Sequence, residues 1–291
     1  MNWLRLPSYA KINFGLIIKS KRRDGFHEIE TILQQIDLKD EIELQAKEEP
    51  NIELCCEDPD IPTGNANLCV QAANLLTQTL GLQKGVNIVL KKSIPAGAGL
   101  GGGSSNAAVV LLGLNKLWNL KLKPEKLKAL ASQLGSDVPF FIHGGTAIAR
   151  GRGDILLPCH IQGDFTILII IPRIRISTHW AYGRVNLSLT MNEKNIKLKH
   201  FRSTTCLDAE FFNDLTNDLE TTVFERHPIL SRIKTELYHT GAIFASMSGS
   251  GSAIFGIFQK RNQALKAKQH FRNQYAAIVS RPISWGFEQI N

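Results

Sequence analysis

Residues 95–108 read PAGAGLGGGSSNAA, with five glycines in fourteen positions followed at once by two serines. Glycine loses more backbone freedom on folding than any other residue, so a cluster this dense requires a structural reason. The preceding VNIVLKKSI alternates apolar and polar residues like a strand, and the following AVVLLGLNKLW has apolar residues at helical spacing. A glycine loop between a strand and a helix brings N–H groups and a positive helix end together, an arrangement that binds phosphate. The stretch therefore predicts a phosphate-binding loop.

Three common phosphate loops do not fit this stretch. Gly97, Gly99 and Gly102 satisfy G-x-G-x-x-G, but a dinucleotide fold needs an acidic strand end roughly 20 residues on. That region reads NLKLKPEKL, in which Glu125 lies in a helical run. The P-loop of nucleotide triphosphatases needs a lysine after its last glycine, where this chain has Gly103. A protein-kinase glycine loop joins two strands instead of opening a helix.

The composition is that of a globular chain with an excess of positive charge. The 291 residues are 43% hydrophobic and 21% charged, and 34 Lys and Arg against 26 Asp and Glu give a net charge of +8. This excess is either a solvated surface or a field that attracts an anionic substrate. The basic residues are scattered without an RNA-binding aromatic motif, so no nucleic-acid partner is expected.

The same sequence predicts a cytoplasmic protein without a membrane partner. FTILIIIP (165–172) is far shorter than a membrane span and reads as a buried strand. The N-terminal residues lack the pattern of a signal peptide. The five cysteines fit neither a zinc nor a disulfide pattern, which favours a reducing compartment.

The chain length and the order of elements predict two domains, 1–160 and 161–291. Strands are expected at 10–20, 30–37 and 40–47, helices at 67–81 and 123–135, and a hairpin at 145–158. In the second half, a strand at 164–172 is followed by a loop over 186–206 and helices around 208–215 and 228–241. Two strands about a second glycine-serine turn, a helix and a last strand complete an α+β sandwich.

Three stretches resemble one family. PAGAGLGGGSSNAA is similar to the signature P-x-G-x-G-L-G-S/G-S/G-S-S of the GHMP kinases, which phosphorylate galactose, homoserine, mevalonate and related alcohols. SMSGSGSAIFGIF (246–258) resembles their late glycine-rich motif, and LPSYAKINFGL (6–16) their early strand motif. The resemblance implies a GHMP-kinase-like two-domain α/β (α+β) fold. It places a ribosomal-protein-S5-domain-2-like domain before a ferredoxin-like α+β sandwich, with the active site in the cleft between them.

Three further stretches resemble one branch of this family: AKIN (10–13), RRDGFHEI (22–29) and LGSDVPFF (134–141). The branch phosphorylates the 2-hydroxyl of cytidine diphosphate methylerythritol with ATP, in non-mevalonate isoprenoid biosynthesis. Two alternatives stay open: a kinase of the homoserine or mevalonate type, and a nucleotide-binding regulator without catalysis. A dehydrogenase is a distant third. Both a monomer and a homodimer are compatible with the sequence.

The resemblance assigns catalysis to Asp137 and Lys11. From its neighbours alone, Asp137 is a helix N-cap, because Asp is favoured there and Pro139 follows. The resemblance instead makes it the base that accepts the proton of the attacking hydroxyl. Lys11 alone would extend its ammonium to water, whereas the resemblance places it beside the aspartate, where it stabilises negative charge.

The resemblance also assigns the ATP site. The loop glycines either only turn the chain or allow the close approach of phosphates. Ser104 or Ser105 would direct a hydroxyl toward Mg²⁺, with Ser105 taken as the metal contact, and few carboxylates are needed because magnesium keeps several waters. Asn67 is an N-cap by its position and an adenine contact by resemblance. The predicted ATP-binding residues are Pro95, Ala96, Gly97, Ala98, Gly99, Leu100, Gly101, Gly102, Gly103, Ser104, Ser105, Asn67 and Leu68.

The acceptor site rests on the same resemblance. Phe26 stacks the cytosine and His27 bonds its edge, and Tyr182, or else Trp180, is the second stacking aromatic. The predicted substrate-binding residues are Asn13, Phe26, His27, Thr178, Tyr182, Gly249 and Ser250. His27 and Glu28 begin like a zinc-protease H-E-x-x-H, but Thr31 occupies the last position, and no G-x-S-x-G is present. The sequence therefore excludes a zinc protease of the H-E-x-x-H type and a serine hydrolase of the G-x-S-x-G type.

Overall fold

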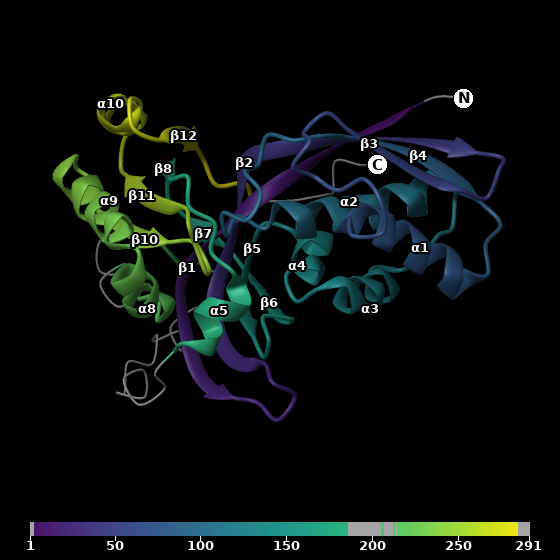
Figure 1. Ribbon diagram of the computed structural model, residues 1–291, viewed down its shortest axis with the longest axis horizontal. Coiled ribbons are helices and arrows are strands. Elements are labelled where there is room, and N and C mark those ends of the chain that lie inside the picture. Colours follow the sequence, from purple (N-terminus) through teal and green to yellow (C-terminus); the bar gives the residue numbers. More distant parts are fainter. Residues whose placement is uncertain (1–2, 186–204, 207–211, 213–214, 285–291) are drawn as a thin grey trace.

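The computed structural model of the protein describes residues 3–185, 205–206, 212 and 215–284. Figure 1 shows a long hairpin of two strands through the middle of the molecule. The helices α1 to α4 lie on one side of it and the C-terminal elements on the other. Among the described residues, no helix combines the length and the apolar character needed to cross a membrane.

The first sheet is built on the hairpin of β1 (Leu4–Lys21) and β2 (His27–Lys47). The other edge of β2 pairs with both β4 (Gly85–Lys91) and β5 (Thr146–Arg150). At the two ends of the sheet, β3 (Ile52–Cys56) runs parallel to β4 and β6 (Ile155–Cys159) runs antiparallel to β5. The strands predicted at 30–37 and 40–47 are therefore one strand, and the hairpin predicted at 145–158 is confirmed.

Four helices cover one face of this sheet: α1 (Leu68–Leu80), α2 (Gly102–Leu117), α3 (Pro124–Leu134) and α4 (Val138–His143). The predicted ends of α1 are confirmed, because Asn67 caps its start and Gly81, with a φ of 62°, ends it in the left-handed conformation. The buried apolar faces of these helices pack onto Leu33, Ile42 and Leu44 of β2. This core fixes the start of α2, and with it the glycine loop.

The second sheet has the strand order β10-β11-β8-β12, with every pair antiparallel. Its strands are β8 (Thr166–Ile171), β10 (Phe244–Met247), β11 (Ile254–Phe258) and β12 (Ala276–Ser280). The helices on this half are α5 (Thr178–Gly183), α8 (Leu219–Arg226), α9 (Pro228–His239) and α10 (Arg261–Phe271). Three described helices, α5, α8 and α9, separate β8 from β10, and β11, α10 and β12 follow. Apart from the additional helices this is the β-α-β-β-α-β pattern of a ferredoxin-like sandwich, and the predicted α+β sandwich with an antiparallel sheet is confirmed.

The short β7 (Ile161–Gln162) pairs in parallel with β9 (Thr205–Cys206). Most of the loop predicted over 186–206, and most of the helix predicted around 208–215, lie outside the described residues.

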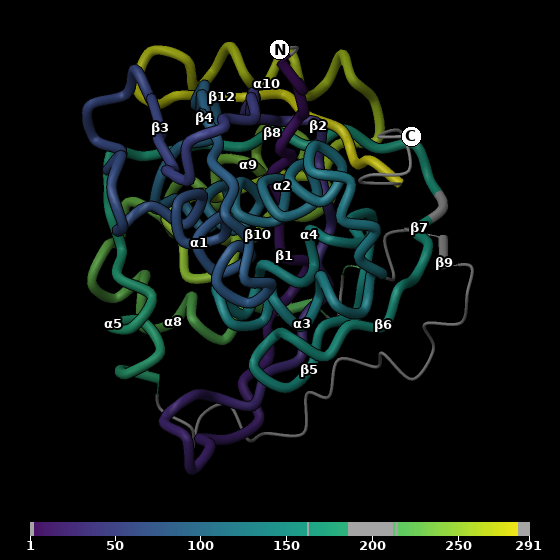
Figure 2. The backbone as a smooth tube through the Cα atoms, turned by 90° about the vertical axis from the view of Figure 1, so that its right-hand side faces the viewer, coloured from purple at the N-terminus to yellow at the C-terminus, as the bar shows by residue number. Residues whose placement is uncertain are grey.

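The two sheets share an apolar core. Ile12 and Phe14 of β1 lie in it, and the ring of Phe14 meets Phe165 and Phe255 edge-on, with centroids 6.1 and 5.8 Å apart. Because side chains alternate along a strand, Lys11 and Asn13 point to the opposite face of β1. Figure 2 shows the turn between β1 and β2 projecting at the bottom of the view, beyond β5 and β6.

Candidate active site

A cavity of about 1070 Å³ lies beside β1. It is bounded by the glycine loop, the start of α1, the turn between β1 and β2, the helix α5 and the turn after β10. Of the predicted site residues, all of which the structure describes, Ser105 alone does not line it. The structure thus gathers residues that are up to 239 positions apart in the sequence, from Lys11 to Ser250, around one space.

The glycine loop presents main-chain donors to this cavity. Gly97, Gly99 and Gly101 have φ of 70°, 78° and 70°, which glycine adopts readily. The first N–H bond of α2 runs from Ser105 N to Gly101 O, at 2.9 Å. The N–H groups of Gly102, Gly103 and Ser104 therefore precede the helical ladder, at the positive end of the helix dipole. This geometry suits an anion with several oxygens.

The loop rests on the second glycine-serine turn, between β10 and β11. Ser248 Oγ donates to Gly99 O at 2.9 Å, and Ala253 N donates to Ala98 O at 3.1 Å. A Cβ added to Gly99 would lie 2.1 Å from the carbonyl oxygen of Ser248. The two glycine-rich motifs therefore touch through their backbones.

Lys11 and Asp137 form an ion pair in this cavity, with Nζ and Oδ2 3.4 Å apart. The side chain of Lys11 is 5% exposed and that of Asp137 38%, so a buried ammonium stands beside a carboxylate that ligands can reach. Lys11 is tied to the loop, because its N donates to Leu100 O at 2.9 Å. Asp137 stands at the N-cap position of α4, but its side chain makes no capping bond. The interpretation of Asp137 as a side-chain helix cap is therefore wrong.

Ser105 corrects one prediction. It is fully buried, and its Oγ accepts a hydrogen bond from Ser8 Oγ at 2.8 Å, so it does not face the cavity as an ATP or Mg²⁺ contact would. Ser104 lines the cavity instead. The described residues include no cluster of three or more His, Cys, Asp or Glu able to hold a metal ion.

A buried polar network beneath the loop was not predicted from the sequence. The buried Asp40 accepts from Lys92 Nζ at 2.6 Å and Asn106 Nδ2 at 2.9 Å through Oδ2. Its Oδ1 accepts from the N–H groups of Ser93 and Ile94. Lys92 also lines the cavity, and its Nζ lies 3.1 Å from where a Cβ on Gly102 would be. Asp40, one of two aspartates in β2, was the only signal for it in the sequence.

The start of α1 forms the far wall beside the loop. Asn67 Oδ1 accepts from Cys69 N at 2.8 Å, and its Nδ2 donates to Pro62 O at 2.7 Å. The N-cap alternative for Asn67 is therefore correct. Asn67 and Leu68 also line the cavity, together with Pro62. The amide of Asn67 thus fixes the shape of this wall.

Aromatic rings line the opposite end of the cavity. The rings of His27 and Tyr182 have centroids 5.4 Å apart with 34° between their planes. Burial, and then the charge of Asp137, raises the pKa of Tyr182, so its hydroxyl stays protonated. Trp180 packs instead against His227, so of the two candidate aromatics only Tyr182 lines this end. Nearby, the hydroxyls of Thr178 and Ser250 are 2.9 Å apart.

Phe26 stands at the rim of this end, 50% exposed. One face of its ring is covered by the guanidinium of Arg152, whose Cζ lies 4.8 Å from the ring centroid. Arg152 pairs in turn with Asp154, and it lines the cavity. Sequence reasoning missed Arg152, because only the fold brings the turn between β5 and β6 to Phe26.

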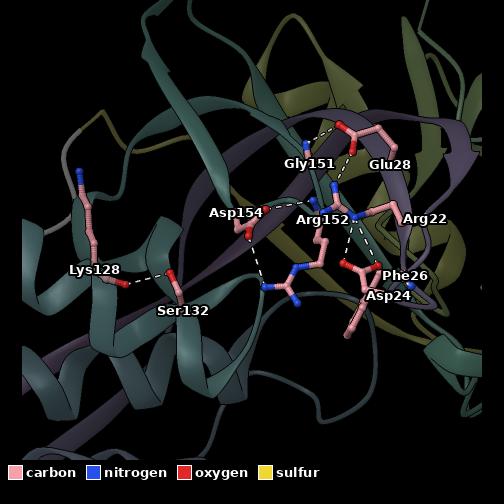
Figure 3. A network of polar contacts seen from close by, with 9 residues as sticks. All are labelled: Arg22, Asp24, Phe26, Glu28, Lys128, Ser132, Gly151, Arg152 and Asp154. Atoms are coloured by element: carbon pink, nitrogen blue, oxygen red, sulfur yellow. Dashed lines mark hydrogen bonds and ion pairs between the residues drawn. The ribbon is translucent and has the colours of Figure 1, made fainter. Parts of the chain in front are cut away.

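Ion pairs fasten the turn between β1 and β2 (Figure 3). Arg22 pairs with Glu28 at 2.6 Å and with Asp24 at 3.1 Å. Asp24 Oδ1 accepts from Phe26 N at 3.1 Å, and Glu28 Oε1 accepts from Gly151 N at 3.1 Å. The exposed ring of Phe26 therefore has an ordered support.

The chain is similar to proteins of known activity. Residues 67–145 match the N-terminal domain of the GHMP kinases, and residues 206–277 their C-terminal domain. It is 40% identical over 285 residues to the 4-diphosphocytidyl-2-C-methyl-D-erythritol kinase of Pelodictyon phaeoclathratiforme, covering 97% of this chain and 98% of that one. It is 41% identical over 272 residues to the protein of the same name from Chlorobium limicola, covering 92% and 93%.

A crystal structure of a 4-(cytidine 5'-diphospho)-2C-methyl-D-erythritol kinase matches the whole fold. Its TM-score is 0.77 at 32% sequence identity, and the match covers 96% of this chain and 99% of that one.

Proposed function

Because the chain belongs to the GHMP kinase family, we propose that it phosphorylates the 2-hydroxyl of 4-diphosphocytidyl-2-C-methyl-D-erythritol with ATP. The relatives that carry this substrate in their names match nearly the full length of the chain. The observation that carries the proposal is the pair of Lys11 Nζ and Asp137 Oδ2, 3.4 Å apart in the cavity that the glycine loop lines. A nucleotide-binding regulator would have no need of this pair.

ATP occupies the side of the cavity formed by the loop and the start of α1. The N–H groups of Gly102, Gly103 and Ser104 bind its phosphate oxygens, and the wall at Asn67 and Leu68 holds the adenine. Magnesium bound with the nucleotide would supply positive charge on the phosphates, and it would need few protein ligands. The cavity fits such an ion, since the Ser104 hydroxyl and the Asp137 carboxylate both line it.

The acceptor occupies the other side, with its cytosine between the rings of Phe26 and Tyr182 and its edge on His27. Asp137 accepts the proton of the 2-hydroxyl as that oxygen forms a bond to the γ-phosphorus. The bond from the γ-phosphorus to the β-γ bridging oxygen breaks, and ADP leaves with that oxygen. Lys11 stabilises the negative charge of the moving phosphoryl group, and both partners are held in line by the cavity. The diphosphate of the acceptor suits the net charge of +8.

The test is ADP release measured with three acceptors: 4-diphosphocytidyl-2-C-methyl-D-erythritol, homoserine and mevalonate. We expect turnover with the cytidine compound and only background release with the other two, because neither carries a base to fill the aromatic end. Mass spectrometry of the product should show one added phosphate. Turnover with homoserine or mevalonate instead would identify another kinase of the family, and no ADP release with any acceptor would favour the regulator.

The histidine at the cytosine end predicts a pH dependence. Burial, and then the charge of Lys21, lowers the pKa of His27 below its ordinary 6.5, so the ring is neutral at pH 7 and can both donate and accept. The unfolded chain binds this proton more readily, so stability rises with pH between the lowered pKa and 6.5. We expect KM for the cytidine substrate to be flat above pH 6.5 and to rise only as acid protonates His27.

A titration of the His27 ring by NMR checks the cause. Lys21→Met should raise its pKa, because a repelling charge is removed, but only part of the way to 6.5, because burial is the larger cause. Lys21→Arg keeps the charge and should leave the midpoint where it is. A midpoint that does not move in Lys21→Met would contradict this assignment.

A further inference from the structure

A line of hydrogen bonds runs behind the ammonium of Lys11. Lys11 Nζ donates to Asn13 Oδ1 at 2.7 Å, and Asn13 Nδ2 donates to Thr31 Oγ1 at 3.0 Å. Thr31 Oγ1 donates in turn to Gly15 O at 2.5 Å. All three side-chain residues are buried: Lys11 and Asn13 are 4% exposed and Thr31 1%. All three also line the cavity, so the line forms part of its wall, with little of each side chain exposed.

The hydroxyl of Thr31 sets the direction of this line. A carbonyl oxygen can only accept, so the single proton of Thr31 goes to Gly15 O. Toward Asn13 the hydroxyl can then only accept, which requires the NH₂ of that amide to face it. The amide oxygen must consequently face Lys11. The ammonium of Lys11 can only donate and so favours the same orientation, and a side chain without a hydroxyl at position 31 would leave Asn13 Nδ2 without this acceptor.

A bulge in β1 supplies the last acceptor of the line, the carbonyl oxygen of Gly15. The register of β1 and β2 pairs Phe14 with Ile32 and Leu16 with Thr31, and it skips Gly15. Gly15 has a φ of 74°, which turns its carbonyl out of the ladder. Thr31 lies directly beside the bulge, where its hydroxyl reaches that oxygen.

We infer that Thr31 is a positioning residue for the Lys11–Asp137 pair, an inference that rests on the proposed function. Asn13 Oδ1 holds the ammonium on one side, and Asp137 Oδ2 meets it at 3.4 Å on the other. The second proton of Asn13 Nδ2 is left for the acceptor alcohol, since Asn13 lines the cavity. Thr31 also lines the cavity, but its only hydroxyl proton is donated to Gly15 O, so in this scheme it acts through Asn13.

The test compares Thr31→Val, which keeps the shape and removes the hydroxyl, with Thr31→Ser, which keeps the hydroxyl. We expect Thr31→Val to lower kcat by about 10- to 100-fold, the effect of a misplaced catalytic group, with KM for ATP unchanged. Thr31→Ser should restore most of that loss. Equal kcat in wild type and Thr31→Val would overturn the inference. Thermal melts establish that each variant folds, and Thr31→Ala replaces Thr31→Val if the latter does not.

A double-mutant cycle with Lys11→Met separates positioning from a general structural role. If Thr31 acts through the ammonium, Thr31→Val should cost almost nothing further once Lys11 is Met. A full additional loss in the double variant would contradict the inference. The comparison of kcat values requires that wild type and Thr31→Ser both phosphorylate the cytidine substrate. If neither does, the proposed function fails first, which the acceptor panel shows independently.

Discussion

Asp137→Asn is expected to lower kcat by about 10²- to 10⁴-fold, because the amide cannot accept the proton of the attacking hydroxyl. The substitution keeps the size of the side chain, and the carboxylate makes no capping bond to α4 that would be lost. ATP affinity should therefore survive, since the loop and the wall at Asn67 are untouched. Single-turnover kinetics with saturating ATP would measure the chemical step.

The matched control is Asp164→Asn, which changes an exposed aspartate that does not line the cavity. It should leave kcat within about twofold, the effect of an ordinary surface substitution. Near-normal kcat in Asp137→Asn would remove the catalytic base from the scheme. Weakened ATP binding with unchanged single-turnover rates would instead assign Asp137 to the nucleotide.

Gly99→Ala is expected to weaken ATP binding by about 10- to 100-fold, which corresponds to about 1–3 kcal/mol of overpacking. The added Cβ would lie 2.1 Å from the carbonyl oxygen of Ser248, a backbone atom that cannot rotate away. The loop must then move away from the turn after β10, and its N–H groups no longer point toward one phosphate position. Isothermal titration with a non-hydrolysable ATP analogue would measure the loss.

Gly97→Ala is the matched control within the same loop. Its φ of 70° imposes the same left-handed strain as the 78° of Gly99, but its Cβ would meet nothing within 4 Å. Any difference between the two variants therefore reports the contact with Ser248. Equal losses of ATP affinity would mean that strain alone, and not the packing of the two turns, governs the loop.

The sequence predicted best what is encoded locally. The glycine loop, both ends of α1 and the hairpin of β5 and β6 follow from glycine positions, caps and periodicity, and the structure confirms them. Ser104 and Ser105 show what the sequence could not predict, namely the direction in which each hydroxyl points. Adjacent helical residues point about 100° apart, and only the packing of α2 decides which hydroxyl faces the cavity and which faces Ser8.

The same limit applies to contacts between distant segments. From its neighbours Asp137 reads as a helix cap, and its pairing with Lys11, 126 positions away, is made by the fold alone. Arg152 against Phe26 and the network around Asp40 are of the same kind. The roles of these residues were accessible only through family resemblance or not at all.

The aromatic seam formed by Phe14, Phe165 and Phe255 has a mechanical consequence. Separating the two sheets along that seam would expose these aromatic rings to water, at a free-energy cost of several kcal/mol. We therefore expect the two halves to stay closed on each other while reactants enter and leave at the outer turns. Cutting the polypeptide near residue 160 would expose apolar surface on each fragment, so we expect each fragment to aggregate when it is made without the other.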